Sequence, residues 1–214
     1  MSAAEDSPVP AGTKGFVARI QNILLKPREE WEVISGEDAP PAALYARYVL
    51  ALAAIGPVAS LIGLWAVGIG ISAGGLGSFH FHMPFGRSLL YAVIAYILAL
   101  GAVYVLGLII DFISPNFGGE KNFRQAFKVA VYASIPAWLG GIFHIFPAIA
   151  FIGGIIGLYG LYLLYLGVPA LMKVPRERAL PCTVVIIVAA IIIYVLIGII
   201  ASAITFGGHV MFYG

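Results

Sequence analysis

The strongest constraint on the fold of this chain is the length of its uncharged segments. Between Tyr48 and Ile110 the only charged residue is Arg87, and the segments 129–172 and 179–214 contain none. Each segment is longer than the roughly 20 apolar residues that cross a bilayer. Only 10% of the 214 residues are charged, whereas soluble domains contain about 25%. The sequence therefore predicts an all-α, polytopic membrane protein and excludes a soluble enzyme or a disordered chain.

Two further counts narrow the class of protein. The single cysteine, Cys182, excludes an intramolecular disulfide framework and a metal cluster held by several cysteines. A net charge of +2 gives no basis for a nucleic-acid partner. Membrane lipids, a second copy of the chain or other membrane proteins are the partners that we expect.

Loop residues divide the uncharged segments into five spans. A glycine-rich segment at 72–86 interrupts the first, and Phe146-Pro147 interrupts the second, because proline disfavours helix at the residue before it. We expect a five-helix transmembrane bundle with a short amphipathic helix before it. The expected spans are Val49–Ile71, Ser88–Ile110, Ala126–Ile145, Ala148–Met172 and Thr183–Thr205.

The basic residues predict the orientation of these spans. The segment up to Arg47 holds five Lys or Arg residues, the loop after the second span holds three, and the loop after the fourth span holds three. The positive-inside rule then places the N-terminus in the cytoplasm, and five spans place the C-terminus on the other side of a bacterial inner membrane. We expect a disordered polar N-terminus at 1–14, cytoplasmic interfacial helices at 15–44, the five-span domain at 45–206 and a short non-cytoplasmic tail at 207–214.

The residues before the first span have helical periodicity. Four apolar side chains recur at the spacing of one helix face, namely Phe16, Ile20, Ile23 and Leu24. Lys26-Pro27 ends this helix, and Pro27 suits the first turn of a second helix at 28–34. We interpret the first helix as lying on the membrane surface rather than docking on a partner.

One acid, Asp111, lies at the edge of a span. An ionisable group in lipid is costly and is a candidate functional site. Because Asp111 is near the expected cytoplasmic end, an ion pair is the simpler interpretation, with Lys128, Arg124 or Lys121 as its partner.

Four histidines form a candidate metal site. His80, His82, His144 and His209 all fall on the expected non-cytoplasmic side. Imidazole suits zinc or copper, but no local spacing pairs these residues. The sequence otherwise implies no cofactor.

Small residues predict close helix packing. Gly153, Gly157 and Gly160 follow the spacing at which two helices approach closely in membranes. A separate motif, Gly70-x-Ser72-x-Gly74, matches the nucleophile elbow of hydrolases. A nucleophile elbow needs a strand before the serine and a helix after it, which this region does not predict.

Three stretches resemble the Yip1 family. The first is Leu24–Trp31, the second combines Asp111, Phe117–Phe127, Tyr132 and Pro136, and the third is Leu161–Met172 with Glu177–Ala179. The resemblance implies five transmembrane helices, a cytoplasmic N-terminus and no known catalytic activity. Eukaryotic members act in membrane traffic and associate with Rab-type GTPases. The N-terminal segment here is short and resembles bacterial members, so GTPase binding does not carry over.

The resemblance also implies a shared centre of Asp111, Tyr132 and Pro136 between the second and third spans. A carboxylate, a phenol and the carbonyl freed by a proline would form one hydrogen-bonded cluster there, beside Lys128 and Arg124.

We therefore expect a non-enzymatic membrane protein that acts as a scaffold or membrane-organising protein. One alternative is a small permease or lipid-handling protein with a polar site near Asp111 and Tyr132, which would show a hydrated cavity or lateral groove. Another is a metal-binding protein that uses the histidines. A hydrolase based on Ser72 is the last alternative.

Overall fold

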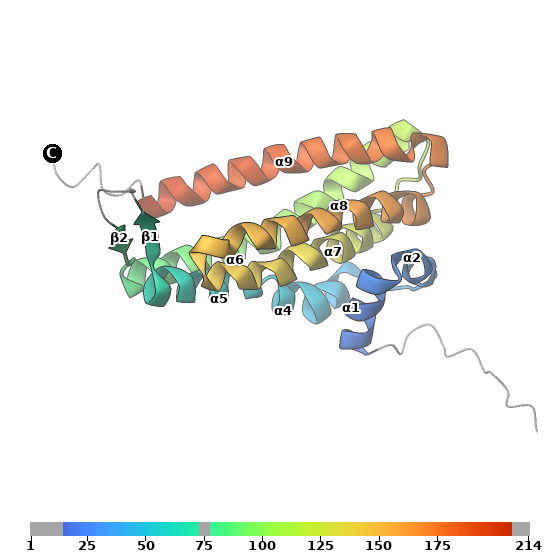
Figure 1. Cartoon of the computed structure of the whole chain (residues 1–214). Helices are drawn as coiled ribbons and strands as arrows, with labels where there is room; N and C mark the ends of the chain where they lie inside the picture. The colour runs from blue at the N-terminus through green and yellow to red at the C-terminus, as the bar shows by residue number, and fades with distance from the viewer. Residues whose placement is uncertain (1–14, 73–77, 207–214) are drawn as a thin grey trace, which may run out of the picture.

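A computed structural model describes residues 15–72 and 78–206 of the chain. These residues form an elongated helical bundle, with a small β-hairpin at one end (Figure 1). Five helical segments are long and apolar enough to cross a membrane, which confirms the predicted all-α, polytopic fold. They cover Pro41–Val67, Phe85–Phe117, Phe123–Ile145, Pro147–Met172 and Arg176–Leu196.

The first span consists of several short helical pieces. They are α3 (Pro41–Leu44), η1 (Tyr45–Val49), α4 (Leu50–Leu52), α5 (Ile55–Ile62) and η2 (Gly63–Val67). Both η1 and η2 are π-helical, and the left-handed Gly68 (φ 75°) ends the span. This span begins at Pro41, eight residues earlier than the expected Val49.

Two β-strands pair where the first span was expected to end and the loop at 72–86 to begin, so the span ends at Val67 rather than at Ile71. Strands β1 (Ile69–Ser72) and β2 (Ser78–Phe81) pair antiparallel, with Gly70 opposite His80. The glycines in this segment hid the short strands from the sequence analysis, because glycine weakens any strand pattern.

The remaining spans are more regular. The second span is α6 (Phe85–Ile113), which η4 (Ser114–Phe117) extends. The third is α7 (Phe123–Gly140) with η5 (Gly141–Ile145), and the fourth is η6 (Pro147–Ile149) with α8 (Ala150–Met172). The chain turns between them at the extended residue Phe146, as the proline at 147 predicted. The fifth helix, α9 (Arg176–Phe206), starts seven residues before the expected Thr183.

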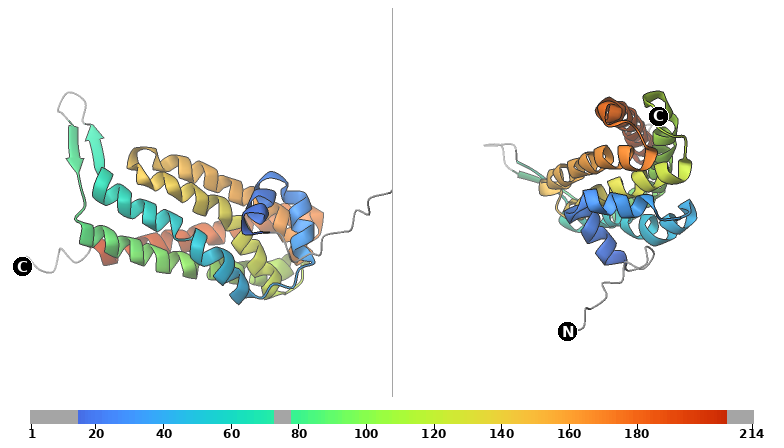
Figure 2. Two further views of the ribbon diagram at one scale, coloured as in Figure 1. Left: turned by 90° about the horizontal axis from the view of Figure 1, so that it is seen from below. Right: turned by 90° about the vertical axis from the view of Figure 1, so that its right-hand side faces the viewer.

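Helix α7 occupies the centre of the bundle. Every residue from Ala126 to Pro136 is buried, and α7 packs against α6, α8 and the pieces of the first span. Helix α9 lies apart from α7 and packs mainly on α6 and α8 (Figures 1 and 2).

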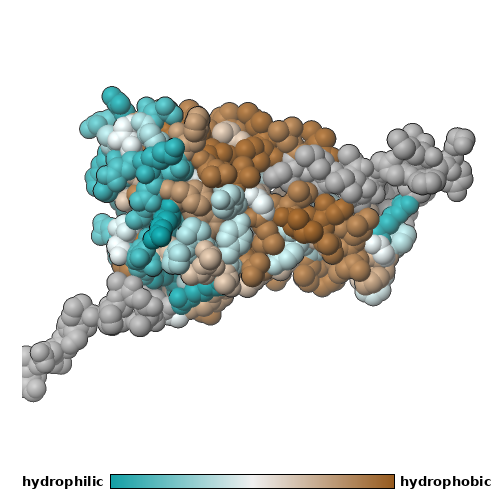
Figure 3. All heavy atoms as spheres, turned by 180° about the vertical axis from the view of Figure 1, so that it is seen from behind, coloured by the Kyte–Doolittle hydropathy of each residue, from teal (hydrophilic) through white to brown (hydrophobic). Residues whose placement is uncertain are grey.

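The polar side chains gather at one end of the bundle, and an apolar band covers its middle (Figure 3). We call this the basic end. It holds the N-terminal helices, the loop between η4 and α7, and the loop between α8 and α9, and most of the basic residues lie in or next to these segments. We call the other end the hairpin end. Glu120 joins the two loops of the basic end, because its N–H donates to the Met172 carbonyl at 2.8 Å and its carboxylate pairs with Lys173.

The N-terminal helices α1 (Phe16–Leu25) and α2 (Pro27–Ser35) fold against the basic end (Figure 2). The apolar face of α1, which we expected on the membrane surface, instead packs on the bundle. Ile23 is fully buried, and the ring of Phe16 stacks on Tyr48 at 5.3 Å. Tyr159 of α8 donates a hydrogen bond to the Leu24 carbonyl. Aromatic and hydrogen-bonding partners on the bundle therefore hold this face more specifically than lipid would.

Candidate functional site

The polar groups of the basic end join α1 and α2 to α7. Lys128 of α7 is only 2% exposed, and its Nζ donates to the carbonyls of Ile34 (3.0 Å) and Glu37. Ile34 lies in the last turn of α2, where a helix leaves carbonyls unsatisfied, and Glu37 lies two residues beyond the end of the helix. The lysine therefore caps α2 from the neighbouring helix, and its positive charge lies at the negative end of the α2 dipole.

A second buried cation, Arg19, links α1 to α2. Its guanidinium pairs with Glu30 at 2.5 Å and also with Glu37. Burial by itself lowers the pKa of Arg19, but the neighbouring Tyr132, Glu37 and Glu30 outweigh that effect and the pKa is raised. The guanidinium is therefore charged throughout the physiological pH range.

Aromatic rings fill the space beside these ion pairs. Trp31 of α2 meets Tyr132 of α7 edge-on at 6.1 Å, and Tyr48 lies 5.3 Å from Tyr132. A Cβ at Gly167 of α8 would lie 2.8 Å from the Trp31 ring, so the indole requires a glycine at that position. We call Arg19, Glu30, Trp31, Glu37, Lys128 and Tyr132 the clamp.

Asp111 does not belong to this cluster. Its Oδ1 is buried without a hydrogen-bond partner, and no ion pair joins it to another residue of the described ranges. It lines a groove of about 620 Å³ between α6 and α9, together with Lys121. The single cluster expected for Asp111, Tyr132 and Pro136 is therefore wrong in its geometry. The spacing of four residues along α7 directs Lys128 and Tyr132 toward α1 and α2, whereas Asp111 lines the side of α6 next to α9.

Two more residues expected at this cluster, Arg124 and Pro136, have separate roles. Arg124 forms an exposed ion pair with Asp38 at 3.2 Å. Pro136 is buried inside α7 and lacks the N–H that would bond to the Tyr132 carbonyl four residues earlier.

The three glycines expected to pack helices lie along α8, and two of them face α7 at close range. A Cβ at Gly153 would overlap the Gly140 carbonyl, and one at Gly160 would lie 2.5 Å from the Ala133 carbonyl oxygen. At Gly157 a Cβ would meet only the Ala137 side chain, at an ordinary 3.6 Å. The contact between α7 and α8 therefore depends on Gly153 and Gly160 more than on Gly157.

The structure describes the side chains of two of the four histidines, His82 and His144. The exposed His82 places Nδ1 3.3 Å from the Trp65 carbonyl, and the exposed His144 lies on η5. The side chain of His80 and all of His209 lie outside the described part. Among the residues that the structure describes, no three His, Cys, Asp or Glu side chains come together as metal ligands.

Ser72 is the last residue of β1. A nucleophile elbow requires a helix after the serine. Residues 73–77 lie outside the described part of the chain, and the next described residues form the strand β2.

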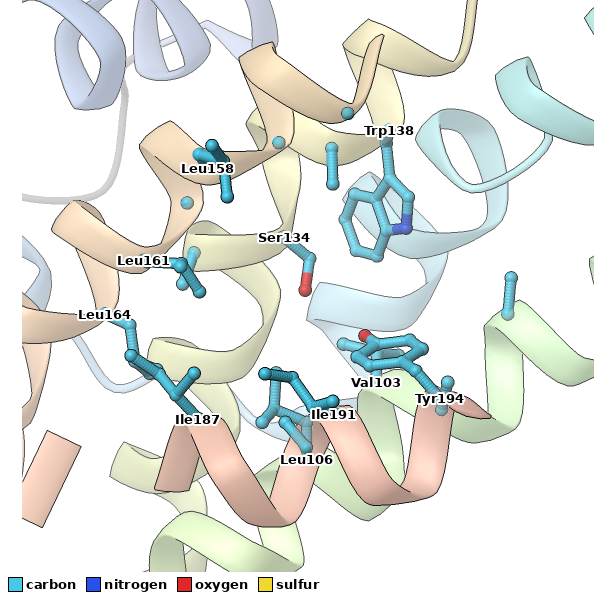
Figure 4. A pocket seen from close by; sticks show the side chains of 18 residues that line it. Val103, Leu106, Ser134, Trp138, Leu158, Leu161, Leu164, Ile187, Ile191 and Tyr194 are labelled. Atoms are coloured by element: carbon cyan, nitrogen blue, oxygen red, sulfur yellow. The ribbon is translucent and has the colours of Figure 1, made fainter. Parts of the chain in front are cut away.

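A lateral cavity of about 460 Å³ lies between α6, α7, α8 and α9 (Figure 4). Its wall is mainly apolar and includes Leu106, Leu158 and Ile191. Ser134, Trp138 and Tyr194 add the polar side-chain atoms of this lining (Figure 4). Most ligand pockets have volumes of about 300–1,000 Å³ and a few polar groups on an apolar wall, which this cavity matches.

Neither the ionic part of the clamp nor the lateral cavity is predicted from the sequence. Arg19 is absent from the predicted apolar face of its helix, although it follows Phe16 by three residues and precedes Ile23 by four, which places it beside them. The cavity has no sequence signal, because its lining comes from four helices and consists of ordinary span residues.

Comparisons with known proteins agree with this fold. The model of the Yip1 domain matches residues 22–206. The inner membrane protein YohC of Escherichia coli (strain K12) is 24% identical over 167 residues, which cover 77% of this chain and 84% of YohC. The protein of the same name from Escherichia coli O6:H1 matches equally well. No solved structure matches the chain significantly. On the extent of the domain match, this five-span integral membrane protein belongs to the Yip1 family.

Proposed function

We propose that this protein is a non-catalytic scaffold that organises other components of a bacterial inner membrane. The proposal includes an N-terminus in the cytoplasm and a C-terminus on the opposite side. Its partners are membrane lipids and either a second copy of the chain or other membrane proteins.

The clamp is the observation that carries this proposal. The buried cations Arg19 and Lys128 hold α1 and α2 on the bundle through carboxylates and backbone carbonyls. Buried charged groups that pair with one another and with backbone carbonyls give a rigid surface rather than a reactive centre. A rigid surface at the end of a membrane bundle suits the binding of a partner, because little conformational entropy is lost on association.

The distribution of charge supports the orientation. Arg19, Lys128 and the basic loops all lie at one end of the bundle, whereas Arg87 begins the span at the hairpin end. The positive-inside rule assigns such an end to the cytoplasm.

Photo-crosslinking in native membranes tests the scaffold. A crosslinking amino acid is placed at Leu25, which is 79% exposed on α1, or at the matched control Val188, which is 51% exposed on α9. We expect Leu25 to capture one defined protein, which can be the chain itself, and Val188 to capture mainly lipid. Transport or turnover of a defined substrate by the purified protein, lost in Asp111→Asn, would contradict the proposal.

The lateral cavity favours a second function, the handling of lipids. It is apolar and lies between spans, so an acyl chain from the bilayer would match its wall. This location differs from the polar site near Asp111 and Tyr132 that the sequence suggested. In vesicles with a fluorescent lipid, Ala190→Phe should slow lipid movement by filling the cavity. Val188→Phe, which adds the same ring to an exposed position of α9, should not.

A further inference from the structure

A second cavity, of about 470 Å³, lies at the basic end between α2, the last turns of α8 and the start of α9. The lining from α2 and α9 is polar and includes Arg28 and Arg176. The lining from α8 is largely apolar and includes Leu166 and Ala170. The cavity therefore combines a cationic side with a side that continues into a membrane span.

The two arginines give this cavity a net positive charge. Both are exposed, and neither forms an ion pair with any residue that the structure describes. One carboxylate, that of Glu32, also lines the cavity. Two cations against one anion leave an excess charge of +1, which attracts an anionic group.

Unused hydrogen-bond donors lie beside the arginines. Trp31 lines the cavity and is only 1% exposed, yet its indole Nε1 has no acceptor in the described part of the chain. A buried donor without a partner costs about 1–3 kcal/mol. Helix α9 begins at Arg176, and both Arg176 and Ala179 of its first turn line the cavity. The first turn of a helix favours an anion, so the lining combines two guanidinium groups, a helix start and an indole whose Nε1 has no partner in the described part of the chain.

The position of the cavity indicates where the anion comes from. Tyr165, Leu166 and Ala170 belong to the fourth span, close to its end at Met172. The cationic wall is therefore level with the boundary between the apolar band and the polar end, where phospholipid headgroups lie. A soluble anion would leave the apolar wall in contact with water, whereas a lipid chain would cover it.

We infer that this cavity binds the headgroup phosphate of an anionic phospholipid, with an acyl chain along Leu166 and Ala170. The phosphate accepts hydrogen bonds from Arg28 and Arg176, for which a guanidinium is well suited. This inference does not rest on the scaffold, because its residues belong neither to the ion pairs of the clamp nor to the lateral cavity. It assigns a lipid class and a site at the basic end of the bundle.

Native mass spectrometry of the full-length protein tests the site. The protein is released from detergent that contains phosphatidylglycerol or phosphatidylcholine, and the retained lipid is counted. We expect one phosphatidylglycerol per chain in the wild type, and far less phosphatidylcholine. In R28Q/R176Q we expect retention of phosphatidylglycerol to fall about 30-fold, since each basic residue near a membrane surface contributes about fivefold.

A matched double variant controls for charge. R124Q/R178Q removes two arginines from the same end of the bundle without touching the cavity lining, and it should retain phosphatidylglycerol like the wild type. An equal loss in both double variants would overturn the site, as would equal retention of the two lipids by the wild type.

Two further arms identify the source of the phosphate. Ala170→Phe fills the apolar side and should weaken retention of phosphatidylglycerol, while circular dichroism confirms that the helices remain folded. Inorganic phosphate at millimolar concentration should not displace the lipid. Complete displacement by inorganic phosphate, together with normal retention in Ala170→Phe, would assign the site to a soluble anion and overturn the lipid proposal.

Discussion

The third and fifth spans of this bundle differ in how much of their surface the protein covers. In the most apolar 18-residue stretch of the third span 72% of the residues are buried, against 22% in the corresponding stretch of the fifth span. Helix α7 is surrounded on all sides and carries buried polar groups such as Lys128 and Tyr132. Helix α9 contacts α6 and α8 and leaves a cavity on the side that faces α7.

This difference shows what holds helices together in lipid. Because lipid tails are as apolar as the helix surfaces, close packing and hydrogen bonds provide the association energy rather than hydrophobicity. Helix α7 has both, through Lys128 on one side and the glycines of α8 on another. The bundle is therefore expected to be rigid around α7 and deformable around α9. Of three pairs of substitutions, one compares the two helices directly, and two test the ionic and glycine contacts on which the rigid part depends.

The largest expected effect is at Arg19. Arg19→Met removes the guanidinium that pairs with both Glu30 and Glu37. We expect the free energy of unfolding to fall by about 3–5 kcal/mol, because removing one partner of a buried ion pair is strongly destabilising. Reversible unfolding in mixed detergent micelles measures it. Arg124→Met removes the exposed pair with Asp38 and should cost only about 0–1 kcal/mol, so equal losses in the two variants would refute the buried ion pair.

A smaller effect is expected from shortening one isoleucine in each span. Ile135→Ala in α7 empties a fully buried position, whereas Ile191 in α9 is 55% exposed. We expect Ile135→Ala to cost about 2 kcal/mol, near the lower end of the values for buried positions, because lipid already solvates apolar groups in the unfolded chain. Ile191→Ala should change stability by well under half of that amount. If the same titration showed the reverse order, the packing contrast between α7 and α9 would be incorrect.

The smallest effect is expected at two neighbouring glycines of α8. Gly153→Ala places a methyl group against the Gly140 backbone, whereas Gly154→Ala meets nothing within 4 Å. We expect Gly153→Ala to cost about 1 kcal/mol, because the higher helix propensity of alanine offsets part of the overpacking penalty. Gly154→Ala should be neutral or stabilising by up to about 1 kcal/mol, since alanine favours a helix over glycine. Thermal unfolding of the two purified variants checks this, and a stable Gly153→Ala protein would show that α7 and α8 can separate without cost.

The sequence alone determined the number and order of the spans, because each requires an apolar run of a length set by the bilayer. It also determined the break at Phe146-Pro147 and the collection of basic residues at one end of the bundle. These features are local along the chain, so composition and spacing are sufficient to locate them. The sequence did not predict the pairing of β1 with β2, because the glycines of this segment weaken the alternation that marks a strand.

Only the tertiary structure decided which polar groups meet. Arg19 and Lys128 are far apart in the sequence, and they come close because α1 and α2 fold back onto α7. Asp111 is nearer to Lys128 along the chain, but it lines a different groove. The direction of a side chain depends on how its helix is rotated against its neighbours, and that rotation is set by packing across several helices. For the same reason the two cavities, each lined by three or more helices, exist only once the bundle has formed.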